Sequence, residues 1–481
     1  ALIGSTFQQT VSDRQALIAN GFKSDDVMED IAAASSLEPM WDGSIHNVYK
    51  YNAAFGRISA NWQNKYILTV NARRDGSSRF GPENKFRNFI SLGGAWIFVE
   101  EKWIKDHIPA FSFGKIRASY GTTGSDQIGD YAYLSLYNNE PSSVPYQTGS
   151  TGLVPRGLPN PYLQWEETRK LQVGLDLGFW QDRILLNMNY SRNRSSNQLL
   201  SYRLPYFTGF NSVNTNFPAT VQNTGLEVAL SVDNIHRQDF RWSASANITI
   251  PRNKLLKFPG IEETTYANYL FVGKSITTRA YYDLVGVDPT TGLYLFRHKD
   301  KTISSYPGYG TENKTVLLNS DQRFYGGLEN SFTYKGFQLS FLFQFVKQLG
   351  MNYTLGASGT GWAQNQSATI LNAWRKPGDA AAVQRYSLGF EKGQETWEPY
   401  FAAQYSDAVF VDASFVRLKN VALSWRLPES LLKSMGIRDM RFYFEGQNLF
   451  TYSGYHGVDP ETQGTTLPPL RVLTAGIQLT F

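Results

Sequence analysis

The sequence predicts an all-β protein, namely a transmembrane antiparallel up-and-down β-barrel with about fourteen strands and long extracellular loops. Aromatic residues make up 15% of the 481 residues, although the mean hydropathy is only −0.35. No stretch approaches the roughly 18 consecutive apolar residues that a membrane-spanning helix needs. In a membrane barrel only every second strand residue meets lipid, so many aromatics and a low mean hydropathy occur together.

The last stretch of the chain shows the alternation most clearly. From Leu473 to Phe481, apolar side chains occupy every second position, with small or polar side chains between them. Because side chains alternate across a strand, one face is apolar and the other polar. A strand of a soluble β-sandwich can have the same pattern, so the interpretation depends on whether the alternation recurs. It recurs in segments 1–10, 54–62, 66–73, 90–98, 115–120, 171–179, 184–190, 226–232, 240–248, 332–334, 337–345, 415–425 and 442–450.

The connections between these segments alternate in length. Short turns such as Lys335-Gly336 join one end of the strands. Long loops join the other end, at 122–165, 194–220, 251–322 and 350–411. Outer-membrane barrels have this asymmetry, so we expect the short turns in the periplasm and the long loops outside. A soluble β-rich protein would instead have to bury an apolar face on every strand.

Two local features depart from regular strands. Ser24 precedes a pair of acidic residues and predicts the N-cap of a short helix over 25–34. The apolar phase of segment 415–425 slips near Lys419-Asn420, which predicts a β-bulge.

The residue types argue against catalysis, a metal site and a cofactor. The chain has no cysteine, and its five histidines are scattered without an i, i+4 pair or a carboxylate at motif spacing. Neither a Gly-x-Ser-x-Gly elbow nor a Walker A sequence occurs. The net charge of +5 is dispersed, which argues against nucleic acid as a partner. We expect no catalytic residue, metal or cofactor, although the existence of barrel enzymes leaves an enzyme as a formal alternative.

Several segments carry a family resemblance. Residues 65–81 (KYILTVNARRDGSSRFG) and 115–124 (KIRASYGTTG) resemble signatures of the SusC/RagA family of TonB-dependent outer-membrane transporters of the Bacteroidota. Further matching segments are LQWEET at 163–168, GLD at 174–176, VGVDPTTG at 285–292, SFVRLKN at 414–420, GQNLFT at 446–451 and GVDPE at 457–461. Residues 216–227 depart from the Gly- and Asn-rich segment that the family has before its next strand.

The resemblance implies that residues 1–481 form the C-terminal part of an outer-membrane barrel of about 22 strands. The plug, the TonB box and about eight N-terminal strands would then lie outside this sequence, in the same or a separate chain. An open sheet edge in lipid leaves N–H and C=O groups unpaired. We therefore expect the strand at 473–481 to pair with a segment outside the sequence.

The resemblance also implies active import of a large nutrient, an oligosaccharide or a peptide, by the SusC-like barrel of a SusCD-type complex. The implied partners are a SusD-like lipoprotein lid, the N-terminal barrel and plug portion, TonB acting through the plug, and membrane lipid. The lid is expected to hinge on the loops 122–165 and 194–220. The alternative is a non-transporting SusC-like scaffold subunit of a larger outer-membrane assembly.

Two groups of residues are candidates for binding. Aromatic side chains in the long loops suit a substrate or the lid, and they suit packing of the loops on themselves equally well. The loop candidates are Tyr133, Tyr137, Tyr162, Trp165, Tyr202, Tyr206, Phe207, Tyr266 and Tyr269. Charged residues on the polar strand faces would line the lumen, where they meet water or the plug. The lumen candidates are Arg57, Arg73, Arg117, Asp176, Glu227, Arg241 and Glu445.

Overall fold

The computed structural model describes residues 1–40, 43–140, 152–308, 310–352, 355, 365–366, 368–388, 396–432, 436–464 and 466–481. Parts of the predicted loops 122–165 and 350–411 therefore lie outside the described residues. The chain forms two compact units. Unit 1 comprises Ala1–Ala95, Ala118–Leu171 and Asn193–Thr220, and unit 2 comprises Trp96–Arg117, Gln172–Arg192 and Val221–Phe481.

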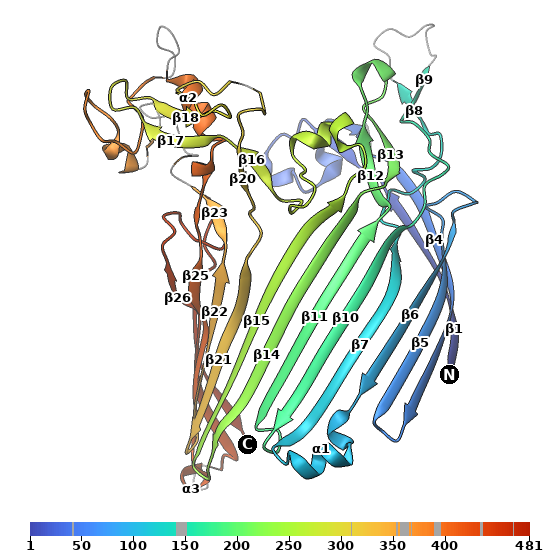
Figure 1. Cartoon of the computed structure of the whole chain (residues 1–481), viewed down its shortest axis with the longest axis vertical. Helices are drawn as coiled ribbons and strands as arrows, with labels where there is room; N and C mark the ends of the chain where they lie inside the picture. Colours follow the sequence, from blue (N-terminus) through green and yellow to red (C-terminus); the bar gives the residue numbers. More distant parts are fainter. Residues whose placement is uncertain are drawn as a thin grey trace. The chain divides into compact units, whose positions relative to one another are not determined.

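Fourteen strands form one large antiparallel sheet, which confirms the predicted fold class (Figure 1). Their order in the sheet follows their order in the chain once the short strands of the loops are set aside. The strands are β1 (Leu2–Arg14), β4 (Ile45–Trp62), β5 (Tyr66–Ser77), β6 (Phe86–Trp96), β7 (Phe111–Ser125), β10 (Glu166–Phe179), β11 (Ile184–Ser196), β14 (Thr220–His236), β15 (Phe240–Lys257), β21 (Phe324–Tyr334), β22 (Phe337–Lys347), β25 (Phe415–Arg426), β26 (Asp439–Ser453) and β27 (Val472–Thr480).

Shorter strands pair with one another inside the loops. They are β2 (Leu17–Asn20) with β3 (Ser36–Pro39), β8 (Tyr137–Glu140) with β9 (Gly152–Pro155), β12 (Gln198–Arg203) with β13 (Ser212–Phe217), β16 (Arg279–Tyr281) with β20 (Val316–Leu318), β23 (Leu349–Met351) with β24 (Phe410–Asp412), and the trio β17 (Asp283–Val287), β18 (Tyr294–Arg297) and β19 (Ile303–Ser304). The α-helices are α1 (Lys102–His107), α2 (Trp397–Ala403) and α3 (Glu429–Leu432). None of the helices in the described part of the chain has the length and apolarity to cross a membrane.

The predicted helix after Ser24 is wrong. The structure instead has two single-turn 3₁₀ segments, η1 (Asp25–Val27) and η2 (Ile31–Ala33), and the Ser24 side chain makes no capping hydrogen bond. Asp30 caps η2 by accepting a hydrogen bond from the Ala32 N–H. Val27, Met28 and Ile31 have helical spacing but remain exposed in the structure, so a longer helix would have gained little from packing.

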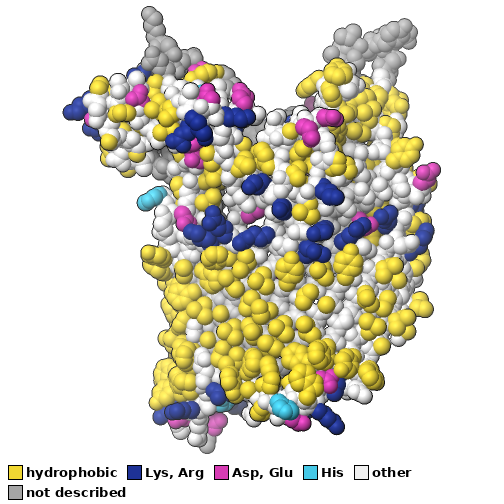
Figure 2. All heavy atoms as spheres, in the orientation of Figure 1, with side chains coloured by type: hydrophobic (Ala, Val, Ile, Leu, Met, Phe, Trp, Pro, Cys, Tyr) yellow, Lys and Arg dark blue, Asp and Glu magenta, His cyan; other side chains and the backbone are white. Residues whose placement is uncertain are grey.

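The register of the strands gives the sheet one apolar and one polar face. In unit 1, Ile58 lies opposite Val70, whereas the neighbouring Arg57 lies opposite Asn71. Opposed residues point to the same side of a sheet, so the apolar positions of β4 and β5 form one continuous surface. In unit 2 the aromatic pairs on the apolar face are Trp242–Phe332, Phe337–Trp425 and Trp425–Phe442. Figure 2 shows hydrophobic side chains gathered over the strands, an exposed apolar surface of the kind that lipid covers.

The β21–β22 hairpin depends on its turn residues. Lys335 and Gly336 both have positive φ, 43° and 88°, as the two central residues of a type I′ turn require. A Cβ at Gly336 would lie 2.6 Å from the Arg426 carbonyl oxygen, so glycine is required by space as well as by conformation.

The predicted β-bulge in β25 is confirmed. In the pairing of β22 with β25, Leu342 lies opposite Asn420 and Phe343 lies opposite Leu418, which leaves Lys419 as the extra residue. The pairing of β25 with β26 shifts at the same place, where Lys419 faces two residues of β26, Asn448 and Leu449. The bulge keeps apolar residues on the same face on both sides of the slip, because one extra residue restores the alternation.

β1 and β27 stand at the two ends of the strand order. β1 pairs with β4, and β27 pairs with β26 from Thr480 opposite Asp439 to Val472 opposite Gln447. Within the described residues the order does not join β27 to β1. A self-closed barrel of fourteen strands, the alternative to pairing with a segment outside the sequence, is therefore not found here.

The two faces should respond differently to a charge. Phe341 lies opposite Val421 on the apolar face, and its neighbour Ser340 lies opposite Ala422 and Ser331 on the polar face. Phe341→Arg is expected to lower the free energy of unfolding by about 2–4 kcal/mol, because arginine near the middle of the bilayer is costly. Ser340→Arg should cost far less. Denaturant unfolding of the lipid-reconstituted protein measures both, and equal costs would contradict the assignment of the faces.

Candidate binding surface and its anchors

The polar face of unit 2 carries five of the predicted lumen residues. Arg117 on β7 forms an ion pair with Asp176 on β10 at 3.3 Å, and Asp176 also accepts a hydrogen bond from Asn187. Arg241 on β15 forms an ion pair with Asp233 on β14 at 3.3 Å. Glu227 and Glu445 are exposed on the polar faces of β14 and β26. Arg117 and Arg241 are thus matched with carboxylates, as expected for charges in a confined polar space.

Unit 1 carries the other two lumen residues. Arg73 on β5 forms an ion pair with Asp75, donates a hydrogen bond to the Tyr51 hydroxyl at 2.6 Å and lies over the Phe55 ring. Arg57 is exposed, and among the described residues its side chain bonds only to Ser59, at 3.3 Å, through its Nε. Arg73 is therefore held in place, whereas Arg57 keeps its charge free for water or a ligand.

A polar groove of about 390 Å³ opens on the polar face of unit 2 near the short turns. Its lining includes Arg183, Asp233, Arg241 and Glu329. One oxygen of Asp233 accepts from Arg241, while Oδ1 is buried and has no hydrogen-bond partner among the described residues. The groove can thus contact polar groups of either charge, but no three side chains in the described part of the chain are grouped to hold a metal ion.

The base of loop 122–165 is a small hydrophobic core in unit 1. Trp165 is 4% exposed and packs against Phe80 and Phe89, with ring centroids 5.2 and 5.8 Å apart. Its Nε1 donates to the Lys85 carbonyl at 3.1 Å, and Tyr133 packs on the same core. This burial is a correction to two predicted contact residues, because a ligand cannot reach Trp165 and reaches Tyr133 only in part. The sequence favoured them because Trp and Tyr are common at binding surfaces and their partners lie tens of residues away.

An ion pair and hydrogen bonds also hold loop 122–165. Arg79 binds Asp130 at 2.9 Å and lies over the Tyr49 ring at 4.4 Å. Asp126 accepts hydrogen bonds from the Tyr49 and Ser77 hydroxyls, each at 2.7 Å. The segment RRDGSSRFG, which carries the family resemblance, thus works as an anchor for the loop that follows β7.

Four predicted loop aromatics remain exposed. Tyr162 is 74% exposed, and Tyr137 on β8 is exposed as well. Tyr206 and Phe207 form the tip of the β12–β13 hairpin in η4 (Tyr206–Thr208), at 91% and 90% exposure. Apolar rings held this far into solvent by a paired hairpin are typical of contact surfaces.

The three other loop aromatics pack on neighbours. Tyr202 stacks on Phe217 across the β12–β13 hairpin, with centroids 5.6 Å apart. In unit 2, Tyr266 meets Tyr269 edge to face at 5.6 Å, and the Arg279 guanidinium lies over the Tyr269 ring. These rings are half buried and stabilise their own loops, so they are secondary as contact candidates.

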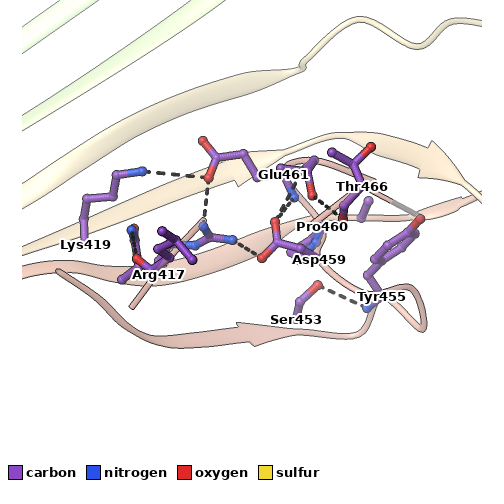
Figure 3. A network of polar contacts seen from close by, with 12 residues as sticks. Arg417, Lys419, Ser453, Tyr455, Asp459, Pro460, Glu461 and Thr466 are labelled. Atoms are coloured by element: carbon purple, nitrogen blue, oxygen red, sulfur yellow. Dashed lines mark hydrogen bonds and ion pairs between the residues drawn. The ribbon is translucent and has the colours of Figure 1, made fainter. Parts of the chain in front are cut away.

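A buried ion network that the sequence did not predict holds the loop after β26 (Figure 3). Arg417 on β25 is 1% exposed and binds Asp459 at 2.5 Å and Glu461 at 2.9 Å. Asp459 also accepts the backbone N–H groups of Glu461 and Thr462. Two segments of the family resemblance, SFVRLKN and GVDPE, are therefore direct partners in space. The opposite charges of Arg417 and Asp459 are compatible with an ion pair. The two residues are 42 positions apart, however, and sequence spacing does not predict contact over that distance.

The end of β22 joins this network. Gln348 donates to the Pro460 carbonyl at 2.8 Å, and the Tyr455 hydroxyl donates to the Met351 carbonyl at 2.7 Å. Close by, Lys347 binds Asp412 at 2.6 Å, and this hydrogen bond, with further ones from Ser414, lowers the pKa of Asp412 to about 2. The loops of unit 2 are thus fixed to the strand ends by charge as well as by packing.

A large antiparallel sheet with one apolar and one polar face, and with anchored loops at one end of its strands, is typical of an outer-membrane β-barrel protein. The chain is 30% identical over 454 residues to TonB-dependent receptor P3 of Formosa agariphila, covering 88% of this chain and 43% of that receptor. It is 28% identical over 464 residues to TonB-dependent receptor SusC of Bacteroides thetaiotaomicron, covering 89% and 43%. The solved structure of the RagAB peptide transporter matches 100% of this chain and 53% of that chain, with a TM-score of 0.82 and 25% identity. No family model matches the sequence.

The chain is thus a homologue of the TonB-dependent receptors of the SusC/RagA type, and it spans about half the length of the curated relatives it matches. Its location is the outer membrane. These relatives are receptors and a transporter by name.

Proposed function

We propose that the chain is the C-terminal part of the barrel of an importer that takes a large nutrient, an oligosaccharide or a peptide, across the outer membrane. The observation that carries the proposal is the match of the whole chain to the RagAB peptide transporter with a TM-score of 0.82. The charged polar face supports it, because a lumen for polar oligomers needs such a lining. In this proposal the short turns face the periplasm and the long loops face outside.

The proposal also includes the plug, the TonB box and the barrel strands that this sequence does not contain. The curated relatives are about twice as long as this chain, which leaves room for a plug, a TonB box and further strands. Those strands would pair with the free edges of β1 and β27, because an unpaired edge in hydrocarbon costs several kcal/mol per group. TonB would act through the plug and supply the energy.

A SusD-like lipoprotein is the proposed lid, and the loops of unit 1 are its proposed contact. Two observations favour the loops of unit 1 as the contact for the lid. Tyr206 and Phe207 offer nearly fully exposed rings at a hairpin tip, and Tyr137 and Tyr162 add two more. The loop that carries Tyr162 is fixed at its base by Trp165, so contact at the exposed rings would not have to order the loop first.

Uptake tests the proposal. In cells that depend on this protein, Tyr206→Ser/Phe207→Ser should reduce uptake of labelled oligosaccharides or peptides about tenfold, because exposed aromatic anchors dominate such contacts. The control is Trp103→Ser, which removes an exposed ring from α1 at the short-turn end. Retention of the lid on the purified barrel is measured alongside. If wild-type cells import neither oligomer, and the barrel co-purifies with several outer-membrane proteins, the protein is a scaffold and the proposal is wrong.

A further inference from the structure

Cations stand on both faces of the sheet. On the polar face, Arg73, Arg117, Arg241 and Arg417 each have a carboxylate partner, whereas Arg57 bonds to the Ser59 hydroxyl. On the apolar face, five cations have no carboxylate within ion-pair distance in the described part of the chain. We call them the boundary cations, and they are Lys50 and Arg74 in unit 1 and Arg192, Arg252 and Lys254 in unit 2.

Strand alternation places the boundary cations on the outer face. Arg74 lies opposite Ala54 and has the same parity as Val70, while Lys50 has the parity of Ile58. On β15, Arg252 and Lys254 continue the row that begins with Trp242. Arg192 likewise continues the apolar row of β11. Arg74, Arg192 and Arg252 therefore each follow the last apolar residue of their row, and Lys50 and Lys254 stand one outward position further on.

All of these strands place their cations at the end that leads to the long loops. Figure 2 shows Lys and Arg side chains along the upper border of the hydrophobic surface. At the short-turn end the same face finishes in aromatic rings, such as Trp62 with Tyr66 and Phe337 with Trp425. The outer surface thus ends differently in the two leaflets.

The local contacts leave these charges available. In the part of the chain that the structure describes, Arg252 donates to the backbone carbonyls of Pro251 and Arg323, which do not neutralise it. Arg74 donates to the Asn88 side chain at 3.3 Å and lies over the Phe86 ring. Lys347, which ends the apolar row of β22, is by contrast neutralised by Asp412. A long cationic side chain at the edge of an apolar surface extends to the headgroup level, where an anion can pair with it.

We propose that the boundary cations bind the phosphate groups of anionic lipid headgroups in the leaflet on the long-loop side. Charge complementarity favours this occupant, because the cations are continuous with the surface that meets the acyl chains and face away from the lumen. An acidic protein partner would instead need cations on the loops above the bilayer. The proposal rests on the outer-membrane location and holds whether or not the barrel imports a nutrient.

Lipid titration tests the proposal on the protein purified at its natural length from outer membranes. Native mass spectrometry counts bound phosphorylated lipid A on the wild type and on Arg192→Gln/Arg252→Gln/Lys254→Gln. Each cation near a lipid surface contributes about a tenfold change at most, so binding by the triple variant should be roughly 10- to 100-fold weaker. Dephosphorylated lipid A should bind both proteins weakly and equally.

The matched control is Lys299→Gln/Lys301→Gln/Lys376→Gln, which removes the same charge from exposed loop positions. This control should bind phosphorylated lipid A like the wild type. Arg192→Lys/Arg252→Lys/Lys254→Arg keeps the charges and should also bind normally. Equal loss in the loop control, or equal binding by the triple glutamine variant, would overturn the proposal. So would full competition by inorganic phosphate, which would assign the site to free anions.

Discussion

Arg417→Met is expected to destabilise the protein by about 3–5 kcal/mol, because it leaves the Asp459 carboxylate buried without its cation. The loss should appear first in the loop after β26, since Asp459 and Glu461 hold that loop to β25 through Arg417. Denaturant unfolding of the full-length protein measures the global effect. Limited proteolysis at 454–464 measures local opening of the loop.

A second arginine on the same strand supplies the control. Arg426 binds Asp439 at 3.2 Å, but both side chains are well hydrated. Arg426→Met should therefore cost no more than about 1 kcal/mol. Arg417→Lys should fall between the two, because lysine keeps the charge but cannot bind both carboxylates in the forked geometry of a guanidinium. If Arg417→Met behaves like Arg426→Met, the network does not hold the loop.

Trp165→Ala is expected to cost about 3–5 kcal/mol, because it empties the centre of the core formed with Phe80, Phe89 and Leu163. It also removes the donor to the Lys85 carbonyl, which then lacks this partner. The thermal unfolding temperature and the protease sensitivity of loop 122–165 report the loss.

A Tyr162→Ala variant tests binding by the same loop without a large change in stability. Its side chain is largely exposed, so Tyr162→Ala should change the free energy of unfolding by no more than about 0.5 kcal/mol. Lid retention or uptake should fall instead, if the exposed rings are the contact. A large loss of stability in Tyr162→Ala, with none in Trp165→Ala, would mean that the two residues have been given the wrong roles.

The strands could be predicted because each carries its own signal. Alternation within β27 or β22 needs no knowledge of distant residues, since lipid covers one face along the whole strand. The bulge at Lys419 could be predicted for the same reason, because a phase slip is visible within a single segment.

The loops could not be predicted in the same way. Trp165 and Tyr162 are three positions apart and both look like contact residues, yet only Trp165 meets a core built from segments 80 residues away. The pairing of Arg417 with Asp459 likewise depends on the path of the chain between them. The helix predicted after Ser24 failed because a capping residue and two acids cannot stabilise a helix that has nothing to pack against.

The strand order has a consequence for how fast the sheet can form. Many strands pair with a neighbour that is close in the chain, so these additions close only short segments. The longest segments close when β21 joins β15 and when β25 joins β22. The entropy of closing such a segment grows slowly with its length. The pairing of β16 with β20 and of β23 with β24 shortens the part of each segment that stays open. We therefore expect these small loop sheets to form before the long strands meet, and growth of the sheet to be slowest at these two places.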